Sequence, residues 1–463
     1  MTHVVIVGGG PGGYEAALVG VQLGADVTVV DSDGIGGSTV LTDCVPSKTL
    51  IATSELMTAV QESGELGVRF DGQLGDVRGA ARVDLGAVNS RVKALAASQS
   101  ADIGRRLTKE GVRVISGTAW LEGTQTVAVR AEGVEQRLQA DVVLLATGAH
   151  PRVLASARPD GERILTWEQV YDLEELPERL IVVGSGVTGA EFASGYNALG
   201  VDVTLVSSRD RVLPGEDADA ATVLADVLTR RGMTVLDRAR AQGVERAGDG
   251  VRVNLVDGRV VEGSHCLLAV GSVPNTDGLG LDDAGVRTGD GGFIEVDGVS
   301  RTTARGVYAA GDCTGVMMLA SVAAMQGRIA MWHALGDAVA PLDLKAVASN
   351  VFTAPEIATV GWSQTAVDTG EIEASSVMLP LAGNPRAKMQ GIHDGFVKLF
   401  CRPGTGIVIG GVVVGPRASE LIHPVALAVE ARLTVDQLAH AFTVYPSISG
   451  SVAEAARRLH TRA

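Results

Sequence analysis

Three glycines and one aspartate near the start of the chain have the types and spacing needed to hold a dinucleotide. A β-branched run at Val4–Val7 leads into Gly8, Gly10 and Gly13, and a second such run ends at Asp31. Gly8 permits a tight turn, Gly10 lets a pyrophosphate approach a helix N-terminus, and Gly13 lets helix and strand pack closely. Asp31 can accept hydrogen bonds from both ribose hydroxyls. Because strand, helix and acid all fit, the segment predicts a dinucleotide site rather than a glycine-rich turn without a ligand.

The same arrangement occurs a second time in the chain, as an internal duplication. Its glycines repeat the spacing of the first three, and they are Gly184, Gly186 and Gly189. The residue that corresponds to Asp31 is Ser207, followed by Ser208 and Arg209. The acid that binds the ribose of NAD is missing there, whereas hydroxyls and arginines suit a 2′-phosphate. The sequence predicts a second dinucleotide site that binds NADPH, with NADH still allowed; a solvated turn is the alternative for these residues.

Length and composition restrict the class of protein. A chain of 463 residues is too long for one core and predicts about three domains. The net charge of −15 argues against binding nucleic acid or an anionic membrane, both of which need a basic face. The four cysteines have no disulfide-framework or metal-site spacing, so we expect a reducing compartment and no metal. Without an apolar run of about 18 residues or a basic leader, the sequence predicts a cytoplasmic protein.

The rest of the chain predicts elements that cover and extend these two units. Helical spacing occurs at 49–66 and 85–110, around a Gly- and Asp-rich link at 67–79. Strands are predicted at 140–148 and 306–312, ending in Ala-Thr-Gly and Gly-Asp. Further strands are predicted at 112–116, 127–129 and 265–271, and a helix at 319–335. From about residue 350 the pattern predicts an antiparallel sheet with covering helices, a third domain suited to a subunit interface.

Several motifs occur in the order found in one known family. They are the two glycine units, Gly-Gly…Cys-Val-Pro-Ser-Lys at 36–48, Ala-Thr-Gly at 146–148, Ala-Ala-Gly-Asp at 309–312 and Phe-Thr-Ala-Pro-Glu at 352–356. Over essentially its whole length the chain resembles the flavoprotein disulfide reductases, such as dihydrolipoamide dehydrogenase and glutathione reductase. The resemblance implies an α/β fold, with two Rossmann-like three-layer ββα dinucleotide-binding domains and a C-terminal α+β dimerisation domain.

The resemblance also implies domain limits and cofactors. FAD would occupy a domain made of residues 1–150 and 275–345, and NAD(P) a domain at 151–274. Residues 346–463 would form the interface of a homodimer or of a dimer of dimers. The implied FAD contacts, besides the first three glycines and Asp31, are Gly37, Ser38, Lys48, Ala119, Thr147, Gly148, Asp312, Leu319 and Ala320. The implied NAD(P) contacts are the second three glycines, Ser207, Ser208, Arg209 and Gly271.

The site for disulfide chemistry departs from the family. Family members carry Cys-x4-Cys, and alignment on Pro-Ser-Lys makes Cys44 the second sulfur and places Thr39 at the first. The family's C-terminal His-Pro and Glu, supplied by the partner subunit, are replaced by Tyr445 and Gly450. In contrast, Lys48 and Glu191 match the family's ion pair beside the flavin N5, where hydride arrives. The three losses affect one chemical step, so the sequence predicts flavin chemistry without dithiol chemistry.

Electrons from a flavin without a neighbouring disulfide can pass directly to an acceptor such as a quinone. The chain resembles an NAD(P)H:quinone reductase branch of the lipoamide-dehydrogenase line, which implies ping-pong transfer from NAD(P)H to FAD and then to a quinone. Lys48 would tune N5, Glu191 would hold Lys48, Cys44 would be vestigial, and Tyr445 would wall the partner's site.

Other functions remain open at this stage. A peroxidase or disulfide reductase would use Cys44 alone, through a sulfenate or mixed disulfide. A nicotinamide transhydrogenase would exchange hydride between nucleotides without a quinone, and a silent scaffold would keep FAD only for stability. His150 and His440 are candidate proton donors to a quinone, although surface or packing roles are the more common reading. Glu454 would reach the site only if the last helix began elsewhere.

Overall fold

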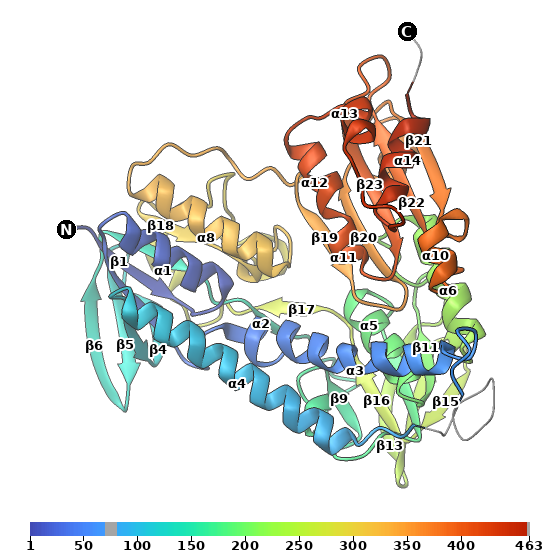
Figure 1. Ribbon diagram of the computed structural model, residues 1–463. Helices are drawn as coiled ribbons and strands as arrows, with labels where there is room; N and C mark the ends of the chain where they lie inside the picture. The colour runs from blue at the N-terminus through green and yellow to red at the C-terminus, as the bar shows by residue number, and fades with distance from the viewer. Residues whose placement is uncertain (70–80, 461–463) are drawn as a thin grey trace. The chain divides into compact units, whose positions relative to one another are not determined.

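The computed structural model describes residues 1–69 and 81–460, and these form two compact units (Figure 1). The first consists of Met1–Thr49, Asn89–Arg152 and Gly271–Leu342, and the second of Leu50–Val88, Val153–Val270 and Asp343–Ala463. Most of the predicted Gly- and Asp-rich link at 67–79 lies outside the described residues. No helix of the described part is both long enough and apolar enough to cross a bilayer.

The first unit is built on a parallel sheet. Its five strands lie in the order β18, β7, β1, β2, β3, and each neighbouring pair runs parallel. They are β1 (His3–Val7), β2 (Asp26–Asp31), β3 (Arg113–Ser116), β7 (Val142–Leu145) and β18 (Val307–Ala309). Their carboxyl ends meet at one edge, which is where ligands bind in open α/β sheets.

Alternating side chains of this sheet face two different layers. Val4 and Ile6 pack toward the helices, and Val5 and Val7 toward a three-stranded antiparallel meander. The helices are α1 (Pro11–Gln22), α4 (Leu85–Lys109) and α8 (Ala320–Ala334), and the meander is β4 (Thr118–Leu121), β5 (Thr126–Ala131) and β6 (Val134–Gln139). This arrangement confirms the predicted three-layer ββα domain.

The second unit contains a sheet of the same design. Its five parallel strands lie in the order β12, β11, β10, β16, β9. They are β9 (Ile164–Thr166), β10 (Arg179–Val183), β11 (Asp202–Val206), β12 (Thr234–Leu236) and β16 (His265–Leu268). Its meander is β13 (Ala241–Ala247), β14 (Gly250–Leu255) and β15 (Val260–Gly263), and its helices include α5 (Val187–Ala198) and α6 (Ala218–Arg230).

The second unit also holds the C-terminal sheet, which is antiparallel with strand order β19, β20, β23, β22, β21. The strands are β19 (Ala348–Val351), β20 (Glu356–Gly361), β21 (Ser375–Pro380), β22 (Phe396–Cys401) and β23 (Val408–Gly415). Side chains such as Val397 and Leu399 pack with Val425 and Val452 of the covering helices. Those helices are α11 (Ala418–Leu421), α12 (His423–Glu430), α13 (Val435–His440) and α14 (Gly450–Arg458). The predicted C-terminal α+β region is therefore confirmed.

Several predicted boundaries were wrong. The strands predicted at 140–148 and 265–271 are only β7 and β16, and two other differences have a local cause. Helix α3 (Cys44–Glu62) begins five residues before the predicted start, because Pro46 lies in its first turn, where the missing N–H has no helical acceptor. The strand predicted at 306–312 is only β18, because Gly311 has a positive φ and the chain turns there. The remaining elements are short: α2 (Gly37–Leu41), β8 (Ala149–Pro151), η1 (Val170–Asp172), β17 (Ser272–Pro274), α7 (Leu281–Ala284), η2 (Asp290–Gly292), η3 (Asp312–Thr314), α9 (Gln364–Asp368), η4 (Leu381–Gly383) and α10 (Pro385–Met389).

Candidate functional site

The turn between β1 and α1 has the backbone geometry that the glycine pattern predicts. Gly8 has φ 106°, and a Cβ placed on it would lie 2.2 Å from the carbonyl oxygen of Ala146. A Cβ on Gly13 would lie 1.9 Å from the carbonyl oxygen of Gly8, so helix and strand are in direct backbone contact. A Cβ on Gly10 would meet nothing within 4 Å. Gly8 and Gly13 are needed for close packing, and Gly10 leaves open space at the helix N-terminus, which fits a pyrophosphate.

The carboxylate of Asp31 is oriented by backbone donors. Its Oδ2 accepts the N–H of Gly9 at 2.6 Å, and its Oδ1 accepts the N–H groups of Asp33 at 2.9 Å and Gly34 at 2.5 Å. These bonds keep the carboxylate beside the glycine turn, where a ribose would lie. The carboxylate has lone pairs for further donors, so its chemistry fits a ribose diol.

The segment after Asp31 folds back against the glycine turn. The N–H of Gly36 donates to the carbonyl of Gly9 at 2.8 Å. A Cβ on Gly37 would lie 2.9 Å from the Cα of Gly10, and Ser38 is exposed in the first turn of α2. Gly37 is therefore beside the open space at Gly10, and the exposed Ser38 follows it in the sequence.

The end of β7 is held by a residue that sequence reasoning missed. The hydroxyl of Thr147 donates to the carbonyl of Asn275 at 2.7 Å, and the Asn275 amide donates to the carbonyl of Thr147 at 2.8 Å. The N–H of Asn275 donates to the carbonyl of Gly148 at 3.0 Å, and its Oδ1 lies 2.6 Å from Nδ1 of His150. Asn275 thus fixes the Ala-Thr-Gly turn, and a polar residue just after β17 was the only signal for it.

Asp312 follows β18 at the same edge of the sheet. No hydrogen bond to its carboxylate is found among residues 1–69 and 81–460. Burial, with a further contribution from Asp43, raises the pKa of Asp312 to about 6. Nearby, the buried Gln326 accepts the N–H of Gly311 at 2.8 Å, another contact that sequence reasoning missed. A partly buried carboxylate that accepts no hydrogen bond from the described residues is suited to accept hydrogen bonds from the hydroxyls of a bound ligand.

Three other predicted FAD contacts have different surroundings. Leu319 is the residue before α8 and Ala320 the first residue of that helix, and both are partly exposed. Ala119 lies in β4 with its side chain buried in the core of the meander side. Contact between Ala119 and an adenine would therefore have to come from its backbone.

The turn between β10 and α5 repeats the geometry of the first. A Cβ on Gly184 would lie 2.0 Å from the carbonyl oxygen of Ala269, and one on Gly189 would lie 1.8 Å from that of Gly184. A Cβ on Gly186 would meet nothing within 4 Å, again leaving open space at a helix N-terminus. The second turn thus fits a dinucleotide for the same reason as the first. Gly271 has φ 94° and belongs to the first unit, where its carbonyl accepts the N–H of Arg152 at 2.9 Å.

The prediction for Ser207 needs a correction. The residue is fully buried, and its hydroxyl lies 2.7 Å from that of Ser185 in the glycine turn. It also donates toward the carbonyls of Arg209 and Arg211 at 3.2 and 3.3 Å. Because this hydroxyl is already bonded inside the protein, it is not on the surface to meet a 2′-phosphate. Ser208 and Arg209 are exposed and remain candidates for that contact.

Lys48 and Glu191 belong to different units, so their pairing stays a prediction. Lys48 lies in α3, and Glu191 is buried in α5. Oε1 of Glu191 accepts the N–H of Phe352 at 2.9 Å, and Ser194, one turn later, accepts the N–H of Ala354 at 3.2 Å. The Phe-Thr-Ala-Pro-Glu segment therefore orients the carboxylate of Glu191, a role that sequence reasoning missed.

The positions of this chain that correspond to the family's dithiol site lie in several elements. Thr39 lies in α2, and Cys44, partly exposed, begins α3. Gly450 begins α14, and the side chain of Tyr445 is 83% exposed. The other thiols, Cys266, Cys313 and Cys401, are free and buried.

The remaining candidates have local partners. Hydrogen bonds from Arg457 and Arg458 lower the pKa of Glu454 to about 2, so this carboxylate is engaged on the surface of its own helix. Nδ1 of His440 lies 2.7 Å from the carbonyl of Asp436. Within the described residues, no group of three or more His, Cys, Asp or Glu side chains could hold a metal ion.

Comparison with known proteins extends over the whole chain. Residues 2–327 match the pyridine nucleotide-disulphide oxidoreductase family, and residues 347–456 match the dimerisation domain of that family. The chain is 56% identical to a Mycobacterium tuberculosis NAD(P)H dehydrogenase (quinone), over 99% of this chain and 94% of the relative. It is 34% identical to dihydrolipoyl dehydrogenase 2 of Haloarcula marismortui, over 100% of this chain and 98% of the relative.

Solved structures show the same fold. The crystal structure of LpdA from Mycobacterium tuberculosis has a TM-score of 0.94 and 55% identity, and all of both chains is covered. The flavoprotein disulfide reductase RclA from Escherichia coli has a TM-score of 0.86 and 23% identity, over 99% of this chain and all of the other. The chain therefore belongs to the pyridine nucleotide-disulphide oxidoreductase family, which implies FAD and NAD(P)H as its cofactors.

Proposed function

We propose that this protein is an NAD(P)H:quinone oxidoreductase that uses FAD and works as a homodimer. The observation that carries the proposal is Thr39 at the position of the family's first redox sulfur, because a threonine cannot form the disulfide. Tyr445 and Gly450 in place of the thiol's base and its orienting acid point the same way. The name of the 56% identical relative, NAD(P)H dehydrogenase (quinone), supports an acceptor of this class.

The first glycine turn fits FAD, and the second fits the nicotinamide nucleotide. Gly10, Asp31 and Asp312 would hold the pyrophosphate, the adenosine ribose and the hydroxyls of the ribityl chain. Gly186 would admit the nucleotide pyrophosphate, and the exposed Arg209 would meet a 2′-phosphate. When bound, FAD supplies the chemistry: it takes hydride from NAD(P)H and passes two electrons to a quinone, which becomes a hydroquinone with two protons.

Glu191 and Lys48 would set the electrostatics beside the flavin. The N–H of Phe352 orients the buried Glu191 carboxylate, so this carboxylate would not need to reorganise in order to pair with Lys48. An ammonium held in this way would stabilise negative charge developing near N5. The Lys48 and Glu191 roles follow from the family resemblance and stay proposals.

Two further parts of the proposal concern assembly and location. Phe442, Val444 and Tyr445 are strongly exposed apolar side chains within the segment that matches the dimerisation domain. Such a patch is typical of an interface between subunits. We infer that it is covered by a second copy of the chain, where Tyr445 would wall the partner's site. We also propose a cytoplasmic location, which the cysteine content supports.

Stopped-flow spectroscopy tests the acceptor. The protein is first reduced with NADPH or NADH and then mixed with a benzoquinone, lipoamide or oxidised glutathione. We expect rapid reoxidation by the benzoquinone alone, and the same result for Cys44→Ser. Reoxidation by lipoamide, or loss of quinone reduction in Cys44→Ser with FAD still bound, would show that the sulfur is needed.

A second variant restores the missing sulfur. Thr39→Cys would recreate Cys-x4-Cys, so anaerobic dithionite titration should consume about four electrons per FAD, against about two for the unchanged protein. If the unchanged protein also took up about four electrons per FAD, a second redox group would be present and the proposal would fail.

A further inference from the structure

Lys398 is a buried cation in the middle of a fully buried strand. All six residues of β22 are buried, and the side chain of Lys398 is only 4% exposed. Its neighbours Val397 and Leu399 face the core under the covering helices, so Lys398 faces the opposite side of the sheet. Its Nζ also lies 5.6 Å from the centre of the Phe396 ring. A lysine in this place needs partners, because burying an unpaired charge is costly.

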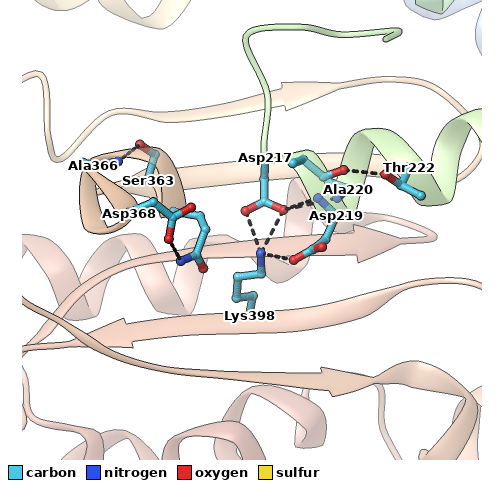
Figure 2. Close-up of polar contacts among 10 residues, drawn as sticks. Asp217, Asp219, Ala220, Thr222, Ser363, Ala366, Asp368 and Lys398 are labelled. Carbon is cyan, nitrogen blue, oxygen red and sulfur yellow. Dashed lines mark hydrogen bonds and ion pairs between the residues drawn. The ribbon is translucent and has the colours of Figure 1, made fainter. Parts of the chain in front are cut away.

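The partners of Lys398 are two carboxylates at the start of α6 (Figure 2). Nζ lies 2.9 and 2.8 Å from the two oxygens of Asp217 and 2.6 Å from Oδ2 of Asp219. The side chain of Asp217 is 2% exposed, and that of Asp219 is 56% exposed. Asp217 also caps α6, since Oδ1 accepts the N–H groups of Asp219 at 3.0 Å and Ala220 at 3.2 Å. Lys398 therefore fixes the first turn of α6 to the C-terminal sheet.

The segment that ends at Asp217 begins at the proposed nucleotide site. Residues 207–216 connect β11 to α6 and carry the exposed Ser208 and Arg209. The segment is tied to the glycine turn twice: Ser207 bonds the Ser185 hydroxyl at 2.7 Å, and the N–H of Leu213 donates to the carbonyl of Ser185 at 2.8 Å. Its far end is tied by Asp217 to Lys398. The side chains that could reach a 2′-phosphate, Ser208 and Arg209, lie between Ser207 and Leu213, and the segment then continues to Asp217.

We propose that Lys398 is a positioning residue for the nicotinamide nucleotide. By holding Asp217, it fixes the far end of residues 207–216, and through that segment it sets the affinity for a phosphate on the adenosine ribose. This inference rests on the proposed function only in placing the nucleotide at the second glycine turn. It does not depend on the electron acceptor.

The alternative is that Lys398 serves stability alone. In that case the loss of Lys398 would weaken the binding of nucleotides with and without the 2′-phosphate by the same factor, or it would leave both affinities unchanged. A positioning role predicts a selective effect, because the pyrophosphate is held by the glycine turn, whereas the 2′-phosphate depends on the placement of residues 207–216.

Calorimetric binding of two probes to the FAD-loaded protein separates these roles. The probes are ADP-ribose and 2′-phospho-ADP-ribose, and the variants are Lys398→Met, Lys398→Arg and the exposed control Lys388→Met. For Lys398→Met we expect the Kd of 2′-phospho-ADP-ribose to rise about tenfold and that of ADP-ribose less than about threefold, the size expected for a weakened charge-assisted contact. Lys398→Arg should recover part of the loss, and Lys388→Met should match the unchanged protein.

Several outcomes would overturn the inference. Equal changes for both probes, or none, would show that Lys398 does not position the segment. If Lys398→Met does not fold, Asp217→Asn decides, because asparagine can still cap α6 but lacks the charge that holds Lys398. An unchanged 2′-phospho-ADP-ribose affinity in Asp217→Asn would count against the role. If the unchanged protein binds neither probe, the placement of the nucleotide itself is wrong, and failure of quinone reduction alone would leave the binding result standing.

Discussion

The two glycine turns share a backbone and differ in the side chain that closes them. Asp31 and Ser207 both bond to the residue between the first two glycines of their turn, Asp31 to the N–H of Gly9 and Ser207 to the hydroxyl of Ser185. Asp31 is partly exposed, and Ser207 is buried. The position has kept one structural duty, closing the turn. Only in the first turn does it also present a charged acceptor for a ribose.

The edge strands of the two sheets differ as well. In the first unit the strand beside β7 is β18, which comes late in the chain and leads into Gly311 and Asp312. In the second unit the corresponding strand is β9, which comes before β10 and ends at Thr166. The first edge thus places the carboxylate of Asp312 just after the carboxyl end of β18. The two units share the backbone of the glycine turn and differ in the side chains at their strand ends.

The largest effect should come from removing the close helix-strand contact in either turn. In Gly13→Val and Gly189→Val the new Cβ would overlap a backbone carbonyl, so we expect a loss of at least about 3 kcal/mol of stability, as for severe overpacking. Gly13→Val should lose FAD, measured by absorbance after gel filtration. Gly189→Val should keep FAD and lose nucleotide binding. Gly104→Ala, where a Cβ meets nothing, is the control; equal loss of FAD in both turn variants would show that the two sites are not separate.

Removing the acid from the first turn should have the next largest effect. Asp31→Ala leaves the N–H groups of Gly9 and Gly34 without their acceptor and removes the ribose ligand, which together should weaken FAD binding by about 2–3 kcal/mol. Ser207→Ala removes a neutral hydrogen bond and should weaken nucleotide binding by about 1 kcal/mol. Titrating apoprotein with FAD, and holoprotein with nucleotide, compares the two. A larger loss of binding free energy in Ser207→Ala than in Asp31→Ala would show that the buried serine matters more for its turn than the aspartate does.

The pH dependence of stability should reveal the titration of Asp312, which follows the edge strand of the first sheet. The pKa of Asp312 in the folded protein is about 6, above the ordinary value of 3.8, so the protonated side chain favours folding. Its contribution to the free energy of unfolding is present below pH 4 and is lost as the pH rises through 6. Asp312→Asn should therefore be more stable than the unchanged apoprotein at pH 7 by up to about 3 kcal/mol, with little difference at pH 4. Urea unfolding at both pH values measures this. A constant difference would mean that Asp312 does not titrate in this range.

The smallest effect concerns nucleotide choice. Arg209→Ala should raise the KM for NADPH about fivefold to tenfold and leave that for NADH nearly unchanged, because only NADPH carries the phosphate that an exposed arginine would bind. Steady-state kinetics with each nucleotide at saturating benzoquinone gives both values. Equal changes for the two nucleotides would place Arg209 away from the ribose.

Much of the fold could be predicted because its signals are local. The glycine spacing, the β-branched runs beside it and the acid at Asp31 each report on a few neighbouring residues. The meanders could not be predicted in full, since β13 has only one buried residue and β15 has none, so their apolar pattern is weak. Asn275, Gln326 and Phe352 were missed because they act through hydrogen bonds to segments that are not their neighbours in the sequence.

The sequence by itself determined the two dinucleotide units, the family resemblance and the loss of the dithiol, because glycine spacing and the identity of a sulfur ligand are properties of single positions. Only the tertiary structure decided that Ser207 closes its turn from inside the protein and that Lys398 holds Asp217. Burial and ion pairing depend on which distant segments meet, and a lysine in an apolar strand does not reveal its partner until the strand and the helix are packed together.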